Sequence, residues 1–236
     1  FQKYNFVSQE EEIFGDDIGD LAWSPDDSKI AYYYAPSSGE RSLIFSDRTN
    51  SNKTIVANFN DMGITNPYLL WSPNSEWLIV IPRNADVNEN KIYLFNAYTR
   101  SFSTVNDGGG NLEAKFSPDS KKIIYSTYSV DPKTPIKSLV SIMDLDGNNK
   151  RSLDLYADID KCVWTNTREN VMVVASYDAE KKRESVFNFD IESKSKSGFD
   201  LSLYSESFVN EMSMSNGDKL LFYIDKQVFF VVSLLN

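Results

Sequence analysis

Short apolar runs alternate with turn-forming residues along the whole chain, and one arrangement of them recurs five times. In the first copy, Leu21-Ala-Trp-Ser-Pro-Asp-Asp-Ser-Lys-Ile-Ala-Tyr, an apolar strand ends in an aromatic residue, a polar turn follows, and a second apolar strand begins. The residues that end the first strand of the five copies are Trp23, Trp71, Phe116, Trp164 and Met214. These anchors recur every ~45–50 residues, so the chain repeats one strand–turn–strand unit.

Each repeat reads as four strands, which are separated by the residues that turns prefer. The second strands are expected at residues 29–34, 77–81, 122–127, 171–176 and 219–224. The third strands are expected at residues 42–46, 91–96, 139–145, 185–191 and 227–233, and the more polar fourth strands at residues 53–58, 101–105, 151–155 and 197–201. This period predicts an all-β fold, a β-propeller with five four-stranded blades.

The fifth repeat has no fourth strand, because the sequence ends at Asn236, soon after its third strand. A spare strand, Lys3–Ser8, precedes the first anchor at about the distance at which a fourth strand should lie. We therefore predict one domain over residues 1–236, in which the N-terminal strand at residues 3–8 completes the blade formed by residues 209–234. Such closure removes an open sheet edge. A fragment of a larger ring and an open array are the alternatives.

Composition narrows the class of protein. Hydrophobic residues make up 41% of the chain and aromatic residues 14%, which is typical of a folded globular protein. The net charge of −10 argues against nucleic acid, because phosphate binding needs clustered Lys and Arg. A basic partner is electrostatically easier. No apolar run approaches the ~18 residues of a membrane helix, so we expect no membrane insertion.

The chemistry available to the chain is limited. Histidine is absent, which removes Ser-His-Asp and Cys-His catalysis and every His-ligated metal site. The single cysteine, Cys162, cannot form an internal disulfide and is expected to be a buried, inert thiol. We therefore expect no catalytic residues and no cofactor. Since the chain begins at Phe1 rather than Met, we expect it to be a processed or excised product.

The repeat resembles that of TolB-type β-propellers, a WD40-like repeat that is also similar to the propeller repeats of the prolyl oligopeptidase and dipeptidyl peptidase families. The matching residues are Trp23-Ser24-Pro25-Asp26, Trp71-Ser72-Pro73, Phe116-Ser117-Pro118-Asp119 and Met143-Asp144-Leu145-Asp146-Gly147. Asp27, Ser75 and Ser120 stand where the family usually carries Gly. The resemblance implies an extracytoplasmic scaffold, periplasmic or secreted, that binds proteins or accompanies a hydrolase.

Two motifs have both a functional and a structural interpretation. Asp144-Leu-Asp-Gly-Asn-Asn opens like a calcium loop, but its twelfth position is Leu155 rather than the required bidentate Glu. A hairpin turn, in which Asp-Gly-Asn supplies positive φ, is the favoured interpretation. Trp23, Trp71 and Trp164 could form an aromatic ligand platform, but their periodicity favours packing between neighbouring blades.

A further set of residues forms the candidate binding site. First strands line the central channel of a propeller, so the residues just before each anchor converge at its mouth. The expected collar comprises Asp20, Tyr68, Glu113, Asp160, Lys161, Asn210 and Glu211. It is mainly acidic and could take a basic peptide segment or a metal ion; a hydrated entrance without a ligand is the alternative. Converging carboxylates raise one another's pKa, which makes glycosidase-like chemistry conceivable.

We expect a monomeric, non-enzymatic β-propeller that binds a protein or peptide partner through one face and the channel mouth. Loops on a rigid scaffold are where recognition residues usually lie. Two functions from other classes stay open: an accessory propeller domain of an extracytoplasmic hydrolase, and a propeller that binds or cleaves carbohydrate. The fold alone does not decide among them.

Overall fold

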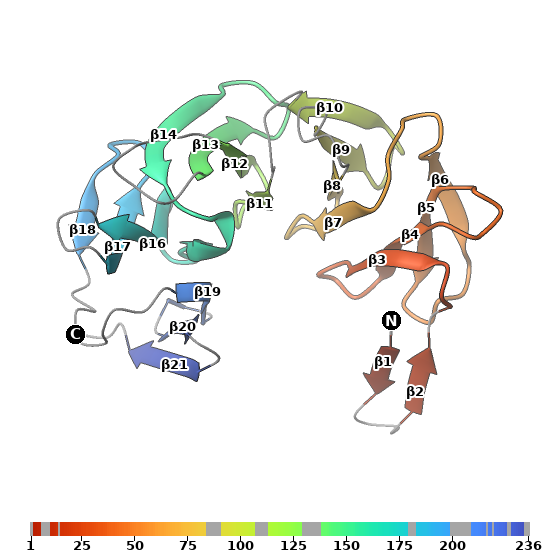
Figure 1. Ribbon diagram of the computed structural model, residues 1–236, viewed down its shortest axis with the longest axis horizontal. Coiled ribbons are helices and arrows are strands. Elements are labelled where there is room, and N and C mark those ends of the chain that lie inside the picture. The colour runs from red at the N-terminus through yellow and green to blue at the C-terminus, as the bar shows by residue number, and fades with distance from the viewer. Residues whose placement is uncertain are drawn as a thin grey trace. The chain divides into compact units, whose positions relative to one another are not determined.

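The computed structural model describes residues 2–5, 10–13, 15–83, 91–106, 113–128, 138–178, 183–198, 209–215, 217–218, 220–225 and 228–233. It divides into two compact units, an N-terminal unit of Phe1–Gly110 and a C-terminal unit of Asn111–Asn236. Both units consist of antiparallel sheets in which successive strands of the chain are neighbours (Figure 1). This is the arrangement that the repeated pattern predicts.

The N-terminal unit contains two four-stranded sheets. The first sheet comprises β3 (Ile18–Trp23), β4 (Lys29–Tyr34), β5 (Ser42–Asp47) and β6 (Thr54–Asn58). The second comprises β7 (Pro67–Trp71), β8 (Trp77–Pro82), β9 (Ile92–Asn96) and β10 (Phe102–Asn106). Their facing side chains share one core, in which the Phe45 ring of the first sheet lies 5.2 Å from the Trp71 ring of the second, centre to centre. The predicted packing of this anchor between neighbouring sheets is confirmed.

The C-terminal unit contains three further sheets. The third sheet comprises β11 (Ala114–Phe116), β12 (Lys122–Tyr128), β13 (Ser138–Asp144) and β14 (Arg151–Tyr156). The 3-10 helix η2 (Ile159–Lys161) leads into the fourth sheet, which comprises β15 (Cys162–Trp164), β16 (Val171–Asp178), β17 (Arg183–Asp190) and β18 (Lys196–Gly198). The fifth sheet comprises β19 (Val209–Met214), β20 (Leu220–Asp225) and β21 (Val228–Ser233). The third and fourth sheets share a core of aliphatic and aromatic side chains.

The turn after each of the first three anchors is built by a Ser and by the Asp or Asn two residues after it. In the first repeat, the Ser24 hydroxyl donates to the Asp26 carboxylate at 2.6 Å and accepts from the backbone N–H of Lys29 at 2.9 Å. The same two bonds recur around Ser72 and Ser117. These bonds close the turn locally and explain why the Ser-Pro-Asp pattern repeats.

The same turns place non-glycine residues in the left-handed backbone region. Asp27 has φ 57, Ser75 has φ 60 and Ser120 has φ 61. These are the three positions at which the TolB-type repeat usually carries Gly, the residue that adopts positive φ without steric cost. The turn therefore keeps its geometry here although the favoured residue is missing.

The N-terminal strand differs from the one predicted at Lys3–Ser8. In the structure, β1 (Gln2–Asn5) pairs antiparallel with β2 (Glu10–Ile13), a strand that sequence analysis did not predict. Among the strands that the structure describes, β21 pairs with β20 only, so the fifth sheet has three strands. The hairpin is reached by closing one short loop, which costs less entropy than pairing distant segments. Residues 6–8 lie outside the described residues, and ring closure and the number of blades stay predictions.

Candidate functional site

The predicted collar residues of the N-terminal unit lie on the adjacent strands β3 and β7. The Asp20 carboxylate accepts a hydrogen bond from the backbone N–H of Leu69 at 2.6 Å. The Arg83 guanidinium lies over the Tyr68 ring, 5.2 Å from its centre. Asp20 therefore holds β7 against β3, and Tyr68 forms a cation–π contact. The carboxylate of Asp20 is committed to the architecture rather than presented to a ligand.

In the C-terminal unit, three collar residues are drawn together around η2. Glu113 directly precedes β11, whereas Asp160 and Lys161 belong to η2. The Glu113 carboxyl accepts a hydrogen bond from the backbone N–H of Ile159, and Lys115 pairs with Asp160 at 3.5 Å. We call the group formed by these charged residues and their ionic partners the acidic cluster; its members are Glu113, Lys115, Asp158, Asp160, Lys161 and Glu184.

Lys161 is buried and fully engaged within the acidic cluster. Only 7% of the residue is exposed. Its ammonium lies 2.6 Å from the carboxylate of Glu184, whose side chain is 2% exposed, and 3.4 Å from that of Asp158. Burying one of these charges without the other is costly. Lys161 thus neutralises the buried carboxylate of Glu184 and pairs with the half-exposed Asp158, and it does not face solvent as a free cation.

The electrostatics of the acidic cluster leave Glu113 in an unusual state. The acidic cluster contains four carboxylates and two ammonium groups, so it carries two excess negative charges when all of them are ionised. Glu113 as a whole residue is exposed, yet partial desolvation of its carboxyl raises its pKa, and the charges of Asp160 and Asp158 raise it further. The ionised form of Glu113 is therefore disfavoured first by partial burial and then by two neighbouring carboxylates, and a nearby cation would favour it.

The last two collar residues lie on β19, whose backbone runs beside η2 within the same unit. Asn210 and Glu211 occupy the second and third positions of this strand; their side chains lie outside the described residues. The structure thus brings the starts of β11, β15 and β19 toward η2, as the collar prediction requires for these repeats. The predicted collar draws residues from both units, so the collar as a whole stays a prediction.

Three members of the acidic cluster were not predicted from the sequence. Asp158 and Lys115 could have been found, because each is a charged residue two positions from a predicted collar residue, close to an anchor strand. Glu184 had no such signal, because it is 23 residues from Lys161 in sequence. Its place depends on the register of β16 and β17, where it pairs with Tyr177.

The other candidate features of the sequence have structural roles. Cys162 is buried, its Sγ donates to the backbone oxygen of Asp158 at 3.6 Å, and burial raises its pKa to about 12, so the thiol is inert. Gly147 has φ 81 in the turn between β13 and β14, and the Asp146 carboxylate accepts from the backbone N–H of Asn148 at 3.0 Å. The hairpin interpretation of this segment is confirmed.

Among the described residues, no three Asp, Glu or Cys side chains gather in a metal-binding arrangement. No helix in this part of the chain is long and apolar enough to span a membrane.

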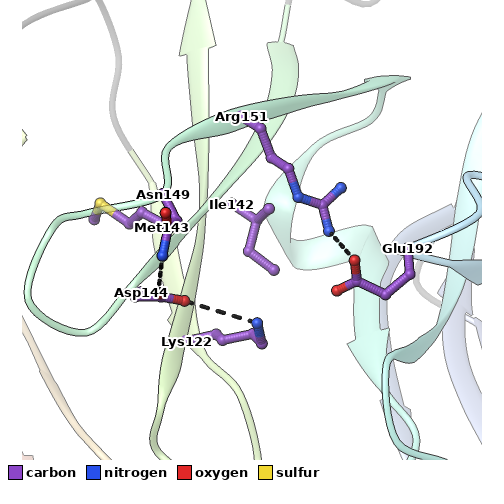
Figure 2. Close-up of a pocket in the computed structure, with 7 residues that line it drawn as sticks. All are labelled: Lys122, Ile142, Met143, Asp144, Asn149, Arg151 and Glu192. Carbon is purple, nitrogen blue, oxygen red and sulfur yellow. Dashed lines mark hydrogen bonds and ion pairs between the residues drawn. The ribbon is translucent and has the colours of Figure 1, made fainter.

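A hollow of about 210 Å³ lies at the opposite ends of the third-sheet strands from Glu113. Figure 2 shows that its charged side chains pair with one another. Arg151 contacts Glu192 at 3.0 Å, and Lys122 lies 3.7 Å from Asp144. The side-chain amide of Asn149 donates to Asp144 at 2.6 Å. With every charge matched inside the hollow, it offers a ligand little to bind.

Comparison with known proteins gives matches to solved structures only. No family model matches the sequence, and no curated protein does. TolB from Acinetobacter baumannii is 17% identical, with a TM-score of 0.61, 98% of this chain covered and 56% of that one. The β-propeller domain of the trilobed protease from Pyrococcus furiosus is 11% identical, with a TM-score of 0.70, 98% of this chain covered and 73% of that one. A prolyl endopeptidase is 16% identical, with a TM-score of 0.64, 96% of this chain covered and 36% of that one.

These likenesses show the fold of the chain, which is that of a β-propeller. They confirm the predicted resemblance to TolB-type propellers and to the propellers of prolyl oligopeptidase-family proteins. The chain spans about half of the TolB structure's length, 56%. At these identities the comparisons identify an architecture, and function has to be argued from the residues.

Proposed function

We propose that the chain is a non-enzymatic β-propeller scaffold that binds a basic segment of a protein or peptide partner at the acidic cluster. The observation that carries this proposal is the composition of the acidic cluster, in which four carboxylates face two ammonium groups and Glu113 is exposed. An incoming Lys or Arg would supply the missing cation. Charge-assisted hydrogen bonds of this kind are about twice as strong as neutral ones.

The position of Glu113 supports recognition rather than catalysis. It is exposed and stands at the start of a first strand, where a propeller presents its channel mouth. No histidine is available as a general base anywhere in the sequence, and the single thiol is buried. A monomeric scaffold outside the cytoplasm, periplasmic or secreted, is the setting that the TolB-type resemblance favours.

An accessory role beside a hydrolase is the second candidate. It is supported by the likeness to the propeller of a trilobed protease and to a prolyl endopeptidase, each of which is longer than this chain. The two proposals make different demands on the acidic cluster. A scaffold needs it to bind a separate protein, whereas an accessory domain needs a catalytic domain in the same polypeptide or complex.

Selection from a display library of random peptides on the intact protein tests the scaffold proposal. We expect the enriched peptides to be rich in Lys and Arg and to lose affinity for the double variant Glu113→Gln, Asp160→Asn. Both substitutions remove a charge and keep the shape of the side chain. Enriched peptides that are not basic, or that bind this variant as tightly as the parent protein, would refute the proposal.

The matched control is the double variant Glu76→Gln, Glu192→Gln. It makes the same change of net charge at two exposed residues in turns at the opposite ends of their sheets. If binding depends on the acidic cluster, this control keeps the affinity of the parent. If binding depends only on the overall charge of −10, both double variants lose affinity equally and the local site is wrong.

A further inference from the structure

Besides the bond between Leu69 and Asp20, two hydrogen bonds join residues of successive repeats near the anchors and turns of the first and second sheets. The indole nitrogen of the anchor Trp71 donates to the backbone oxygen of Ala22, just before the preceding anchor, at 3.0 Å. The backbone N–H of Asp26 donates to the Ser75 hydroxyl at 3.1 Å and so joins one turn to the next. Both bonds depend on the residue types that the repeat places there.

The equivalent boundary between the third and fourth sheets keeps the anchor Trp but has lost the Ser. Arg168 stands at the repeat position of Ser75, and its guanidinium donates to the side-chain oxygen of Asn188 at 2.8 Å. The indole nitrogen of the anchor Trp164 is buried and has no hydrogen-bond partner among the described residues. A buried donor without an acceptor is unfavourable. The seam between the third and fourth sheets is therefore incomplete: it lacks the hydrogen bonds that the anchor Trp and the turn Ser form between the first and second sheets.

A pocket of about 410 Å³ opens at the incomplete seam. The half-buried Trp164 and the exposed Pro118 give it an apolar surface. Asn170 adds a side-chain amide, whereas the amide nitrogen of Asn166 already donates to Ser215 and Asp218. Its volume lies within the ~300–1,000 Å³ that is usual for small-molecule sites, whereas the 210 Å³ hollow of Figure 2 falls below that range. We call it the Trp164 pocket; the residues that carry the argument are Pro118, Asp119, Lys121, Trp164, Asn166 and Asn170.

The charges around the Trp164 pocket are balanced. Lys121 lies 3.9 Å from Asp119, and Lys122 lies 3.7 Å from Asp144 at the pocket's edge. The two other charged residues of the lining, Arg168 and Glu169, are opposite in sign. Because charges of opposite sign offset one another around the pocket, the lining selects neither an anion nor a cation.

The polar groups of the lining supply both acceptors and donors. Carboxylates only accept hydrogen bonds, ammonium groups only donate, and the side-chain amides of Asn do both. Hydroxyl groups also donate and accept. A ligand with several hydroxyls on one side and C–H groups on the other would therefore satisfy the lining and cover the indole ring.

We propose that the Trp164 pocket binds an uncharged sugar of one or two rings. One apolar face of the sugar packs on the Trp164 ring, and its hydroxyls bond to the amides and charged groups of the lining. This site is separate from the acidic cluster, and its ligand is of a different chemical class.

Titration of the full chain with cellobiose, maltose and chitobiose tests the proposal, with saturation-transfer NMR of the sugar and tryptophan fluorescence as readouts. We expect at least one of the three to bind with a millimolar dissociation constant. Trp164→Ala is expected to weaken that binding by about tenfold or more. Arg168→Ser restores the Ser of the repeat, ties the two turns together and is expected to weaken binding likewise. It also serves as the test if Trp164→Ala does not fold.

Two controls separate this site from the rest of the molecule. Trp71→Phe alters an indole whose hydrogen bond is already made and should leave sugar binding unchanged. Glu113→Gln with Asp160→Asn should also leave it unchanged, although it removes the proposed peptide binding. The proposal is overturned if none of the three disaccharides binds. It is equally overturned if inorganic phosphate binds in their place, or if folded Trp164→Ala and Arg168→Ser proteins bind as the parent does.

Discussion

The indole nitrogen of Trp71 donates a hydrogen bond to the backbone oxygen of Ala22 across 3.0 Å and ties the second sheet to the first. Trp164, the same anchor two repeats later, has a buried indole nitrogen without a partner among the described residues. Trp71 and Trp164 occupy the same repeat position, but only the indole N–H of Trp71 has a hydrogen-bond acceptor among the described residues. This difference allows the contribution of this bond to be measured within one protein.

Trp71→Phe should therefore destabilise the protein more than Trp164→Phe does. Both substitutions remove similar ring area, but only the first removes a hydrogen bond and leaves a carbonyl oxygen without its donor. We expect a difference of ~1 kcal/mol in the free energy of unfolding, measured by urea unfolding of both variants. Equal losses would show that the Trp71 bond adds nothing beyond packing.

The positive φ of Asp27 leads to a second prediction. Asp27 is exposed, has φ 57, and forms an ion pair with Arg48 at 3.4 Å in which both side chains are about two-thirds exposed. Such a pair contributes little. Asp27→Gly should raise the free energy of unfolding by roughly 0.5–1 kcal/mol, because Gly adopts this backbone without strain.

Asp27→Ala is the matched control, since it removes the same carboxylate but tolerates positive φ less well than Asp does. We expect it to lower the free energy of unfolding by a similar amount. If both variants shift stability in the same direction, the ion pair rather than the backbone determines the effect. Chemical denaturation at neutral pH distinguishes the two outcomes.

The repeat made the sheets predictable from the sequence, because the structure of each anchor and turn depends on residues close to it in the chain. Ser24, Ser72 and Ser117 bond only to residues within five positions of themselves. Strand order then follows from chain order in every sheet. The β1–β2 hairpin was less visible, since Glu10-Glu11-Glu12-Ile13 shows neither apolar alternation nor β-branched enrichment.

The candidate site was predictable only in part, because it depends on pairings between distant residues. The collar prediction found Glu113, Asp160 and Lys161, whose positions relative to the anchors are fixed by the repeat. It could not show that Lys161 is buried against Glu184, which reaches it from the neighbouring hairpin. The Trp164 pocket was equally hidden, since a periodic Trp signals packing whether or not its nitrogen finds an acceptor.

The buried ion pair between Lys161 and Glu184 should be costly to break from one side. Lys161→Met leaves the carboxylate of Glu184, whose side chain is 2% exposed, without its main partner. We expect a loss of about 3–5 kcal/mol in the free energy of unfolding. The double variant Lys161→Met, Glu184→Leu should recover most of that loss. A double variant as unstable as the single one would show that the pair itself is needed.

Glu113 should make the protein less stable as pH rises. Its pKa is raised above the usual 4.5 in the folded protein, so the folded state holds this proton more tightly than the unfolded chain does. The free energy of unfolding therefore falls as pH rises from about 4.5 through the raised pKa. Glu113→Gln should remove that fall and be more stable than the parent at neutral pH. Urea unfolding at a series of pH values measures both effects.

Asp26 provides the control of opposite sign. Hydrogen bonds from Ser24 and Ser28 lower its pKa from 3.8 to about 2. Its contribution is present above pH 3.8 and is lost as pH falls toward 2. Asp26→Asn should lose stability at neutral pH and differ least from the parent in strong acid. A common pH profile for the Glu113 and Asp26 variants would contradict both assignments.

The closure prediction can be tested by cross-linking the N-terminal strand. Lys3 faces Glu12 across the β1–β2 hairpin, whereas ring closure requires residues 3–8 to lie along β21, where Val231 is 51% exposed. We expect a disulfide to form between cysteines at position 3 and at one of positions 229, 231 and 233, and to raise the melting temperature. Cys162 does not compete, because it is buried and its pKa is raised to about 12.

The variant with cysteines at positions 3 and 12 is the matched alternative, because it fixes the hairpin pairing that the structure describes. A strand has two hydrogen-bonding edges, so closure requires the cross-link to β21 whether or not this second pair also forms. Without closure the edge of β21 stays exposed, which promotes association between molecules and is detected by size-exclusion chromatography. Efficient cross-linking between positions 3 and 12 that stabilises the protein, together with no cross-link to β21, would rule out closure of the ring by this strand.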